Sequence, residues 1–326
     1  MNDNQFTTMI DTIEPFASGH LPVDDGNEIY WEASGNSRGQ PALYLHGGPG
    51  SGIIGGYRRH FNPEQFLIVS FEQRGCGRSR PRVTDPGVDL MKNTTQALIS
   101  DIEKLRIHLK VDKWLLLGIS WGTTLALAYS QAYPEKVSAI VLGAVTTTTS
   151  SEVKWVTEDM GRIFPREWDQ FAAVVQPKRG ERLIDAYYRQ ITGTDLKIRD
   201  SASRAWCAWE DIHISIDPNH RPNPRFQNSE FALPFSILTI HYWKHSAFLS
   251  NTGILANMNY ISHIPCILIH GRLDISSPLD TAWKLHKAWP GSELAVIDDE
   301  GHGGKSMFDK ITCAVAKVSS WAGRGI

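Results

Sequence analysis

Apolar and polar positions alternate over residues 28–142 in a way that is typical of a parallel sheet covered by helices. Short apolar runs are expected to form strands at Glu28–Glu32, Ala42–Leu45, Leu67–Phe71, Trp114–Leu117 and Ala139–Leu142. Between the third and fourth runs, apolar residues recur at helical spacing from Thr95 to Leu109, which predicts a helix with one buried face. This part of the chain therefore predicts the α/β class of fold.

The pattern changes near residue 146 to an irregular, Thr/Ser-rich and Trp-rich sequence, and strand-like alternation returns only at Cys266–His270. A strand at Leu294–Ile297 and a closing helix around Met307–Trp321 are expected to follow. We therefore expect a core made of residues 1–145 and 256–326, interrupted by a mainly helical cap at residues 146–255 that covers the sheet. The tract TTTTSS at 146–151 is a candidate hinge or turn at the start of this cap.

The composition narrows the possible partners. The chain has 326 residues, with 33 Lys+Arg against 35 Asp+Glu, and this near-balance excludes the basic footprint of a nucleic-acid binder or of a membrane-surface protein. The amino terminus lacks a signal-peptide pattern, and no run approaches the roughly 18 apolar residues of a spanning helix, so we expect a cytoplasmic protein. The four cysteines lie far apart without a CxxC pair, so no metal site is expected.

The strongest chemical signal is the segment Gly118-Ile119-Ser120-Trp121-Gly122, which directly follows an expected strand and precedes a helical run. A serine at the tip of such a turn has a strained backbone, and glycines two positions away on each side let the strand and the helix approach. We therefore expect Ser120 to be a nucleophile and the N–H of Trp121, at a helix N-terminus, to stabilise an oxyanion. The alternative is a Gly-rich turn without a catalytic role.

A second oxyanion donor is expected in a loop after an early strand. The sequence His46-Gly47-Gly48-Pro49-Gly50 occupies that position after the strand Ala42–Leu45, and the N–H of Gly48 is the candidate donor. A tight Gly-Pro turn with no catalytic role is the alternative interpretation.

A serine nucleophile needs a general base and an acid that orients the base, here in the chain order Ser, Asp, His. Asp274 lies just past one expected strand, and His302 lies in a Gly-rich loop after the next one. Both positions are carboxyl ends of strands, where open α/β sheets bind their ligands. We expect Asp274 and His302 in these roles, against the competing residues Asp280, Asp298, Asp299, His263, His270 and His286.

The blocks that carry this chemistry resemble those of the proline iminopeptidases, which are prolyl aminopeptidases of the α/β-hydrolase fold. The matching segments are HGGPGSG at 46–52, EQRGCGRSRP at 72–81, NTT at 93–95, GISWGTTLALAY at 118–129 and GRLD…AWKLHKAWPGSEL at 271–294. The resemblance implies an α/β-hydrolase fold with a mostly parallel sheet, a triad of Ser120, Asp274 and His302, and an oxyanion hole made by Gly48 and Trp121. It implies no metal and no organic cofactor.

An aminopeptidase must also recognise a free amino group, which carboxylates in a shielded pocket can do. The segment Trp206-Cys207-Ala208-Trp209-Glu210 resembles the family's W-x-x-W-E segment, whose glutamate contacts the substrate amine. The resemblance therefore implies that Glu210, with Trp209 beside it, binds substrate. Without the resemblance, Glu210 is more simply interpreted as a surface charge.

The sequence departs from the family pattern at positions that bear on substrate choice. Thr239 stands where the family has a second amine-binding glutamate, and a hydroxyl cannot replace a full charge. Gly143 and Thr146 stand where the family has an arginine and a phenylalanine around the proline ring. In EQRGCGRS, Glu72 replaces the usual aspartate, and we expect Glu72, with Arg74 and Arg78, to brace nearby loops. Prolyl specificity therefore does not follow from the resemblance.

The leading hypothesis is a serine hydrolase that removes an N-terminal residue, proline or another small one, from short peptides or aminoacyl amides through an acyl-enzyme. An esterase, a deacylase or a hydrolase that tailors a specialised metabolite would keep the triad and lose the amine site. A binding protein on a hydrolase scaffold is a third hypothesis, which the complete set of Ser120, Asp274, His302 and both oxyanion elements disfavours.

Overall fold

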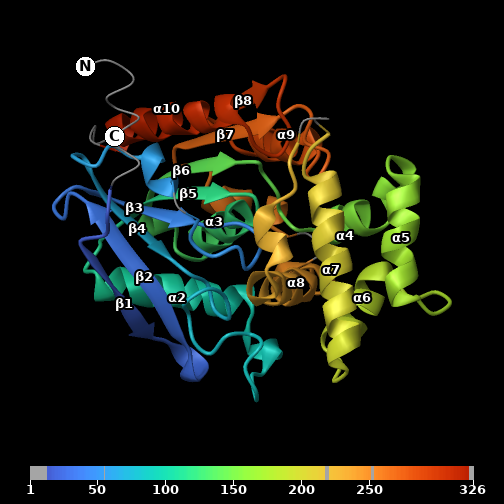
Figure 1. Ribbon diagram of the computed structural model, residues 1–326. Coiled ribbons are helices and arrows are strands. Elements are labelled where there is room, and N and C mark those ends of the chain that lie inside the picture. The colour runs from blue at the N-terminus through green and yellow to red at the C-terminus, as the bar shows by residue number, and fades with distance from the viewer. Residues whose placement is uncertain (1–12, 55, 217–219, 251–252, 323–326) are drawn as a thin grey trace.

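The computed structural model describes residues 13–54, 56–216, 220–250 and 253–322, and its centre is an eight-stranded sheet with helices on both faces (Figure 1). Residues 1–12, where no signal peptide was expected, lie outside the described part. In the described part, no helix is both long enough and apolar enough to cross a membrane.

The sheet is mostly parallel, as expected for the α/β class. Its strand order is β1-β2-β4-β3-β5-β6-β7-β8; the pairings of β2 with β1 and β4 are antiparallel, and the others are parallel. The strands are β1 Ala17–Pro22, β2 Glu28–Gly35, β3 Gln40–Leu45, β4 Phe66–Phe71, β5 Trp114–Ile119, β6 Val137–Gly143, β7 Cys266–Gly271 and β8 Glu293–Ile297. Only β1 was not predicted, because its sequence ASGHLP has few apolar residues and forms a half-exposed edge.

One group of helices covers the two faces of this sheet. A second group comes between β6 and β7 in the sequence. The flanking helices are α2 Thr95–His108, α3 Trp121–Ala132, α9 Leu279–Ala288 and α10 Lys305–Ala322. The helices between β6 and β7 are α4 Ser150–Thr157, α5 Pro165–Val175, α6 Leu183–Ile191, α7 Leu196–His213 and α8 Ser229–Lys244. Short 3₁₀ helices are η1 Asp24–Gly26, η2 Tyr57–His60, η3 Leu90–Lys92, η4 Pro134–Lys136, η5 Asp159–Arg162, η6 Pro224–Gln227, η7 Ser246–Phe248 and η8 Leu255–Tyr260.

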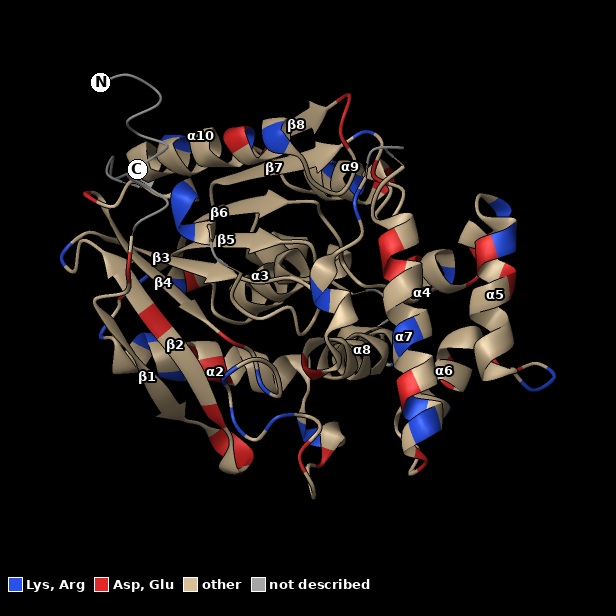
Figure 2. Cartoon of the chain, in the orientation of Figure 1, with Lys and Arg blue, Asp and Glu red and all other residues tan. Residues whose placement is uncertain are grey.

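The central strands are buried on both faces, which explains why they appear in the sequence as continuous apolar runs. On β5, Leu115 and Leu117 join the apolar cluster under α10, whereas Trp114 and Leu116 join the cluster under α2 and α3. Strands β3 to β7 contain no Lys, Arg, Asp or Glu, and these charged residues lie instead on helices, on loops and on the strands β2 and β8 (Figure 2). Because these central strands are packed on both faces, their carboxyl ends are held in a fixed arrangement.

Helices α4 to α8 gather at the carboxyl ends of the parallel strands, on the right of Figure 1. They have an aromatic core of their own, in which the Phe171 ring stacks on Tyr187 and Trp209 at centroid distances of 4.4 and 5.0 Å. We call this group of helices the cap. The division of the chain at residues 145 and 255 stays a prediction.

The threonine tract at the start of the cap is closely tied to the helix that follows it. The Glu152 carboxylate accepts hydrogen bonds from the Thr146 hydroxyl at 3.0 Å, from the Thr147 hydroxyl at 2.7 Å and from the Thr149 N–H at 2.8 Å. Thr149 in turn caps α4 by accepting from the Glu152 N–H, which completes a capping box. Of the two expectations for this tract, the hydrogen bonds favour the turn over the hinge.

Candidate active site

Ser120 stands at the sharp turn between β5 and α3 with φ 56° and ψ −127°, outside the regions that non-glycine residues favour. The two flanking glycines make this turn possible. A Cβ atom at Gly122 would lie 2.1 Å from the Leu45 carbonyl oxygen, and one at Gly118 would lie 2.3 Å from the Gly122 carbonyl oxygen. Both positions therefore require glycine, as the sequence predicted.

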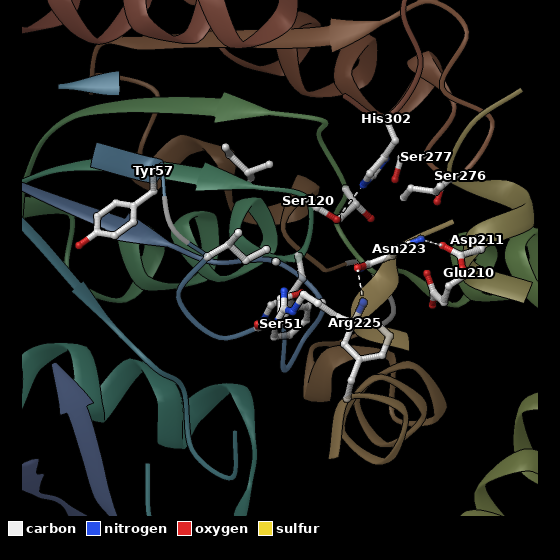
Figure 3. Close-up of a pocket in the computed structure, with 18 of the residues that line it drawn as sticks. Ser51, Tyr57, Ser120, Glu210, Asp211, Asn223, Arg225, Ser276, Ser277 and His302 are labelled. Carbon is white, nitrogen blue, oxygen red and sulfur yellow. Dashed lines mark hydrogen bonds between the residues drawn. The ribbon is translucent and has the colours of Figure 1, made fainter. Parts of the chain in front are cut away.

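A continuous chain of hydrogen bonds joins Ser120, His302 and Asp274. His302 Nε2 lies 2.9 Å from Ser120 Oγ, and His302 Nδ1 lies 2.8 Å from Asp274 Oδ2 (Figure 3). The other carboxylate oxygen of Asp274 accepts from the Ser277 N–H at 2.8 Å. The three side chains come from the carboxyl ends of β5, β7 and β8, so the sheet brings together residues that lie far apart in the sequence.

The electrostatics of this chain suit a general base. Burial opposes the protonation of His302, but the Asp274 carboxylate, with a smaller contribution from Glu210, outweighs it and raises the pKa of His302 above its usual value. Burial also disfavours the charged form of Asp274, yet His302 holds the pKa of this carboxyl below its usual range. Asp274 therefore stays ionised and His302 can take up a proton.

The competing residues have other partners. The His270 ring accepts from the Val145 N–H through Nδ1 at 2.9 Å and donates to the Ser277 carbonyl through Nε2 at 2.7 Å. This ring therefore ties the start of the cap to the loop that carries Asp274. Among the other candidates, Asp298 pairs with Arg272, Asp280 pairs with Lys284, and His286 contacts Ser292.

The two expected oxyanion donors lie beside Ser120. Trp121 is the first residue of α3, so its N–H has no acceptor within the helix. Gly48 has φ 109° in the loop after β3, and this loop touches Ser120, because a Cβ atom at Gly47 would lie 3.2 Å from the Ser120 Cβ. Gly48, Ser120 and Trp121 all line the same cavity.

Two buried side chains fix the loops around these donors. Gln73 accepts from the indole N–H of Trp121 at 2.9 Å and donates to the His46 carbonyl at 3.0 Å, so it joins both oxyanion segments. Glu72 accepts from the Arg78 guanidinium at 3.0 Å and from the Ile53 N–H at 3.3 Å. The expected bracing role of Glu72 thus has a direct geometric basis.

Arg74, the third residue expected to brace this region, forms a fully buried ion pair with Asp101. Its Nε and Nη2 atoms lie 2.6 and 2.8 Å from the two carboxylate oxygens. Such a bidentate pair fixes both orientation and distance. It anchors the loop after β4 to helix α2.

A cavity of about 450 Å³ opens between the carboxyl ends of the strands and the cap, and Ser120 and His302 lie in its wall. Glu210 of α7 lines the same cavity (Figure 3). Its carboxylate accepts from the Trp206 indole N–H at 3.0 Å and lies 3.6 Å from the buried ring of His213. Burial raises the pKa of Glu210 to about 7. A cation that binds beside this carboxylate would stabilise its charged form.

Only some of the residues predicted to contact substrate line the cavity. Thr146 lines the cavity, but Gly143, Trp209 and Thr239 do not. The Thr239 hydroxyl is fully buried and lies 2.9 and 3.1 Å from the carbonyls of Phe235 and Pro49, while the Trp209 indole donates to the Val156 carbonyl inside the cap. Gly143 instead accepts the Ser120 N–H at 3.0 Å and so supports the turn.

The polar residues of the cavity that were missed by the sequence reasoning include Asp211, Asn223 and Arg225. Asp211 directly follows Glu210, the last residue of the W-x-x-W-E segment. That position next to a predicted site residue was the signal that could have identified Asp211. Asn223 and Arg225 lie in the segment RPNPRF, which has no periodicity and matches no motif, so nothing in the sequence marks them.

The cysteines and the potential metal ligands add no second site in the part of the chain that the structure describes. Cys76, Cys207 and Cys266 are buried and Cys313 is exposed, and all four are free thiols. Burial raises the pKa of the buried thiols above their usual value. Among the described residues, His, Cys, Asp and Glu side chains form no group of three placed to hold a metal ion.

Comparisons with known proteins identify the family of the chain. Residues 41–305 match the α/β hydrolase fold family. A proline iminopeptidase of Arabidopsis thaliana is 41% identical over 90% of this chain and 77% of the relative, and a probable proline iminopeptidase of Streptomyces coelicolor is 39% identical over 93% and 94%. The crystal structure of VinJ has the same fold, with a TM-score of 0.65 at 19% identity over 94% of this chain and 99% of that one.

The sequence identity to the two iminopeptidases and the coverage of both chains establish the family. The similarity to VinJ, at 19% identity, supports the fold alone. The protein is a hydrolase of the aminopeptidase type, and its chain belongs to the proline iminopeptidase family of α/β hydrolases.

Proposed function

We propose that the protein is a serine aminopeptidase that removes one N-terminal residue, proline or another small one, from short peptides or aminoacyl amides. One observation carries this proposal. The hydrogen-bonded chain of Asp274, His302 and Ser120 ends in the same cavity as the buried carboxylate of Glu210. A nucleophile and an anionic group in one small cavity suit a substrate whose scissile carbonyl lies close to a cationic amine.

In the proposed reaction, Ser120 Oγ attacks the carbonyl carbon while His302 Nε2 takes the hydroxyl proton. The N–H groups of Gly48 and Trp121 bind the oxyanion that forms. His302 then passes its proton to the leaving nitrogen, the carbon–nitrogen bond breaks, and an acyl-enzyme remains. A water molecule, deprotonated by His302, hydrolyses the ester and returns Ser120 to its hydroxyl form.

Glu210 is the proposed partner of the substrate amine. Its elevated pKa shows the energetic cost of an unneutralised carboxylate in the cavity, and a bound ammonium group would offset that cost. Asp211, the next residue of α7, supplies a second carboxylate to the cavity wall. We propose that Asp211 contributes the second negative charge for which the family pattern has a glutamate at the position of Thr239.

The test is a matched panel of substrates with wild-type protein and the Glu210→Gln variant. Prolyl and alanyl naphthylamides would be compared with their N-acetylated forms and with a simple naphthyl ester. We expect the wild type to prefer the free-amine amides, and Glu210→Gln to lower kcat/KM on these by roughly tenfold to a hundredfold, the effect of losing one charge-assisted contact. Turnover of the ester should change little.

Glu230→Gln is a matched control, because Glu230 is an exposed glutamate of the cap that does not line the cavity. An equal loss of activity on free-amine and amine-free substrates would contradict the role of Glu210. Ester cleavage with little amide cleavage by the wild type would instead support the alternative, an esterase or deacylase. The mostly apolar wall that Phe226, Phe231 and Phe235 give the cavity is the observation that favours this alternative.

A further inference from the structure

Arg225 presents a cation to the cavity without a carboxylate partner in the described part of the chain. Its guanidinium donates one hydrogen bond to the Ser51 carbonyl and stacks on the Phe231 ring, with Cζ 3.6 Å from the ring centroid. Burial lowers the pKa of Arg225 below its usual value, which shows that its charge is poorly solvated. A guanidinium has five N–H groups, and among the described residues the Ser51 carbonyl is the acceptor that the Arg225 guanidinium contacts, which leaves further N–H groups for a ligand.

This arrangement differs from that of the buried arginine outside the cavity. Arg74 pairs with Asp101 in a bidentate manner. Removing a charge from water is unfavourable unless a partner of opposite charge compensates it. At Arg225 the Glu72 carboxylate compensates the charge without outweighing the effect of burial, so a ligand that enters the cavity can add to the compensation. A planar guanidinium suits a carboxylate best.

Hydrogen bonds fix Arg225 relative to the acidic side of the cavity. The Asp211 carboxylate accepts from the backbone N–H of Asn223 at 2.9 Å. The Asn223 side chain in turn accepts from the backbone N–H of Arg225 at 3.1 Å (Figure 3). Glu210 directly precedes Asp211 on α7. The cavity therefore has an anionic and a cationic group mounted on one connected part of the cap, with the Ser120 nucleophile in the same cavity.

The position of Arg225 also relates it to the leaving group. Ser51, whose carbonyl accepts the hydrogen bond from Arg225, belongs to the same loop as Gly47, and Gly47 lies beside Ser120. A substrate whose amine is at Glu210 and whose carbonyl is at Ser120 must place the rest of its length in the remaining cavity. The Arg225 guanidinium is a positively charged group of this cavity, and the loop after β3 holds it through the Ser51 carbonyl.

We propose that Arg225 binds the free α-carboxylate of the residue that leaves, so that the preferred substrates are dipeptides with both ends charged rather than amides or longer peptides. This inference rests on the proposed function, since it uses Glu210 and Ser120 to orient the substrate. It assigns the substrate class by charge: a small zwitterionic peptide, with its ammonium group at Glu210 and its carboxylate at Arg225.

The exposed arginine of the cavity, Arg59, is a less suitable partner. Its Nε donates to the Gly56 carbonyl at 2.8 Å, and its side chain lies in water, where an ion pair contributes little. Arg59→Gln is therefore a matched control for Arg225→Gln. Glutamine at position 225 keeps an N–H donor for the Ser51 carbonyl, and Arg225→Lys keeps the charge without the planar fork.

The experiment compares alanyl-alanine with alanyl-alaninamide, and prolyl-alanine with prolyl-alaninamide, which differ only in the terminal charge. Wild-type kcat/KM should favour the free dipeptide by about tenfold to a hundredfold, as expected for a charge-assisted contact. Arg225→Gln should abolish this preference while leaving cleavage of the amides nearly unchanged. Arg225→Lys should keep part of the preference, and Arg59→Gln should keep all of it.

Binding to the Ser120→Ala variant, followed by calorimetry, separates this inference from the proposed function. The variant should bind the dipeptide more tightly than its amide by the same factor, and Arg225→Gln in that background should equalise the two. If the protein binds with this preference but cleaves neither compound, the proposed function fails, and only the recognition of the carboxylate by Arg225 stands. Equal binding or equal cleavage of dipeptide and amide by the wild type would overturn the inference, as would a preference that disappears in Arg59→Gln.

Discussion

The two walls of the cavity are built in different ways. The wall that holds Ser120, His302 and the oxyanion loops is made from strand ends, and each residue is fixed by the backbone or by a buried side chain. The cap wall is made from the sides of α7 and α8 and from the segment between them, which includes η6, and its charged groups, Glu210 and Arg225, are only partly compensated within the described chain. The positions in the first wall are fixed without a ligand, whereas the charged groups of the second wall gain most when a ligand of opposite charge binds.

The difference suggests a division of labour between the two walls. Chemistry at Ser120 needs fixed distances, and a sheet supplies these at low cost because its strands are already tightly packed. Recognition of a charged ligand needs charged side chains that are shielded from water, and such side chains reduce the free energy of unfolding. Each of the following predictions tests one side of this division, beginning with the largest effect.

Replacing the nucleophile should remove activity and leave the fold intact. Ser120→Ala is expected to lower kcat by at least about 10⁴-fold, as in other enzymes with this triad. Alanine meets the same backbone strain as serine at this position, so the melting temperature should change little. Ser276→Ala is the matched control, because Ser276 also lines the cavity, and it should keep most of the activity.

The measurement for this prediction is kcat on the best substrate of the panel, together with thermal unfolding of both variants. A Ser120→Ala protein with substantial remaining activity would show that the strand-end wall does not hold the nucleophile. A large loss of stability in the same variant would show that this wall needs the Ser120 hydroxyl for folding as well.

Replacing the cap carboxylate should stabilise the protein, in a way that depends on pH. The pKa of Glu210 is about 7 in the fold against 4.5 for an ordinary glutamate, so the folded state holds more protons than the unfolded state between these values. The free energy of unfolding therefore falls as pH rises through this window. Glu210→Gln should raise the free energy of unfolding by up to about 3 kcal/mol at pH 8 and by little at pH 4.

Urea unfolding of the wild type and of Glu210→Gln at both pH values measures this effect. Glu230→Gln, at an exposed position of the same cap, should show no comparable change between the two pH values. If Glu210→Gln has the same stability difference from the wild type at pH 4 and pH 8, then the carboxylate is already neutralised by its surroundings. The contrast between the two walls would then disappear.

The smallest effect is expected at a residue that belongs to neither wall. Thr239 is buried, and its hydroxyl contacts only the carbonyls of Phe235 and Pro49 among the described partners. Thr239→Val should therefore reduce the free energy of unfolding by about 1 kcal/mol, the usual contribution of one hydrogen bond. The ratio of kcat/KM between free-amine and N-acetylated substrates should stay the same, and a changed ratio would place Thr239 back at the substrate.

The strand-end wall could be predicted from the sequence for a physical reason. Ser120, Asp274 and His302 each follow an apolar run by a short, Gly-containing turn, and the ends of parallel strands must meet at one edge of the sheet. Gly118 and Gly122 are required by contacts at 2.3 and 2.1 Å, so the motif itself carries the geometry. No knowledge of distant packing was needed.

The cap wall could not be predicted in the same way. Which side of α7 or α8 faces the cavity depends on how the cap helices pack, so Trp209 and Thr239 were expected at the substrate and instead lie inside the protein. Arg225 was missed because an irregular segment has no period from which to infer a direction. The sheet edge β1 was missed because an exposed edge strand needs few apolar residues.

The buried ring of His270 has a mechanical consequence. One nitrogen holds the backbone at Val145, where the chain leaves the sheet for the cap, and the other holds the carbonyl of Ser277, whose own N–H binds Asp274. The junction between the sheet and the cap is thus tied through one imidazole to the loop that carries Asp274. The first residues of the cap and this loop therefore share one buried anchor, and neither can shift without disturbing a hydrogen bond of His270.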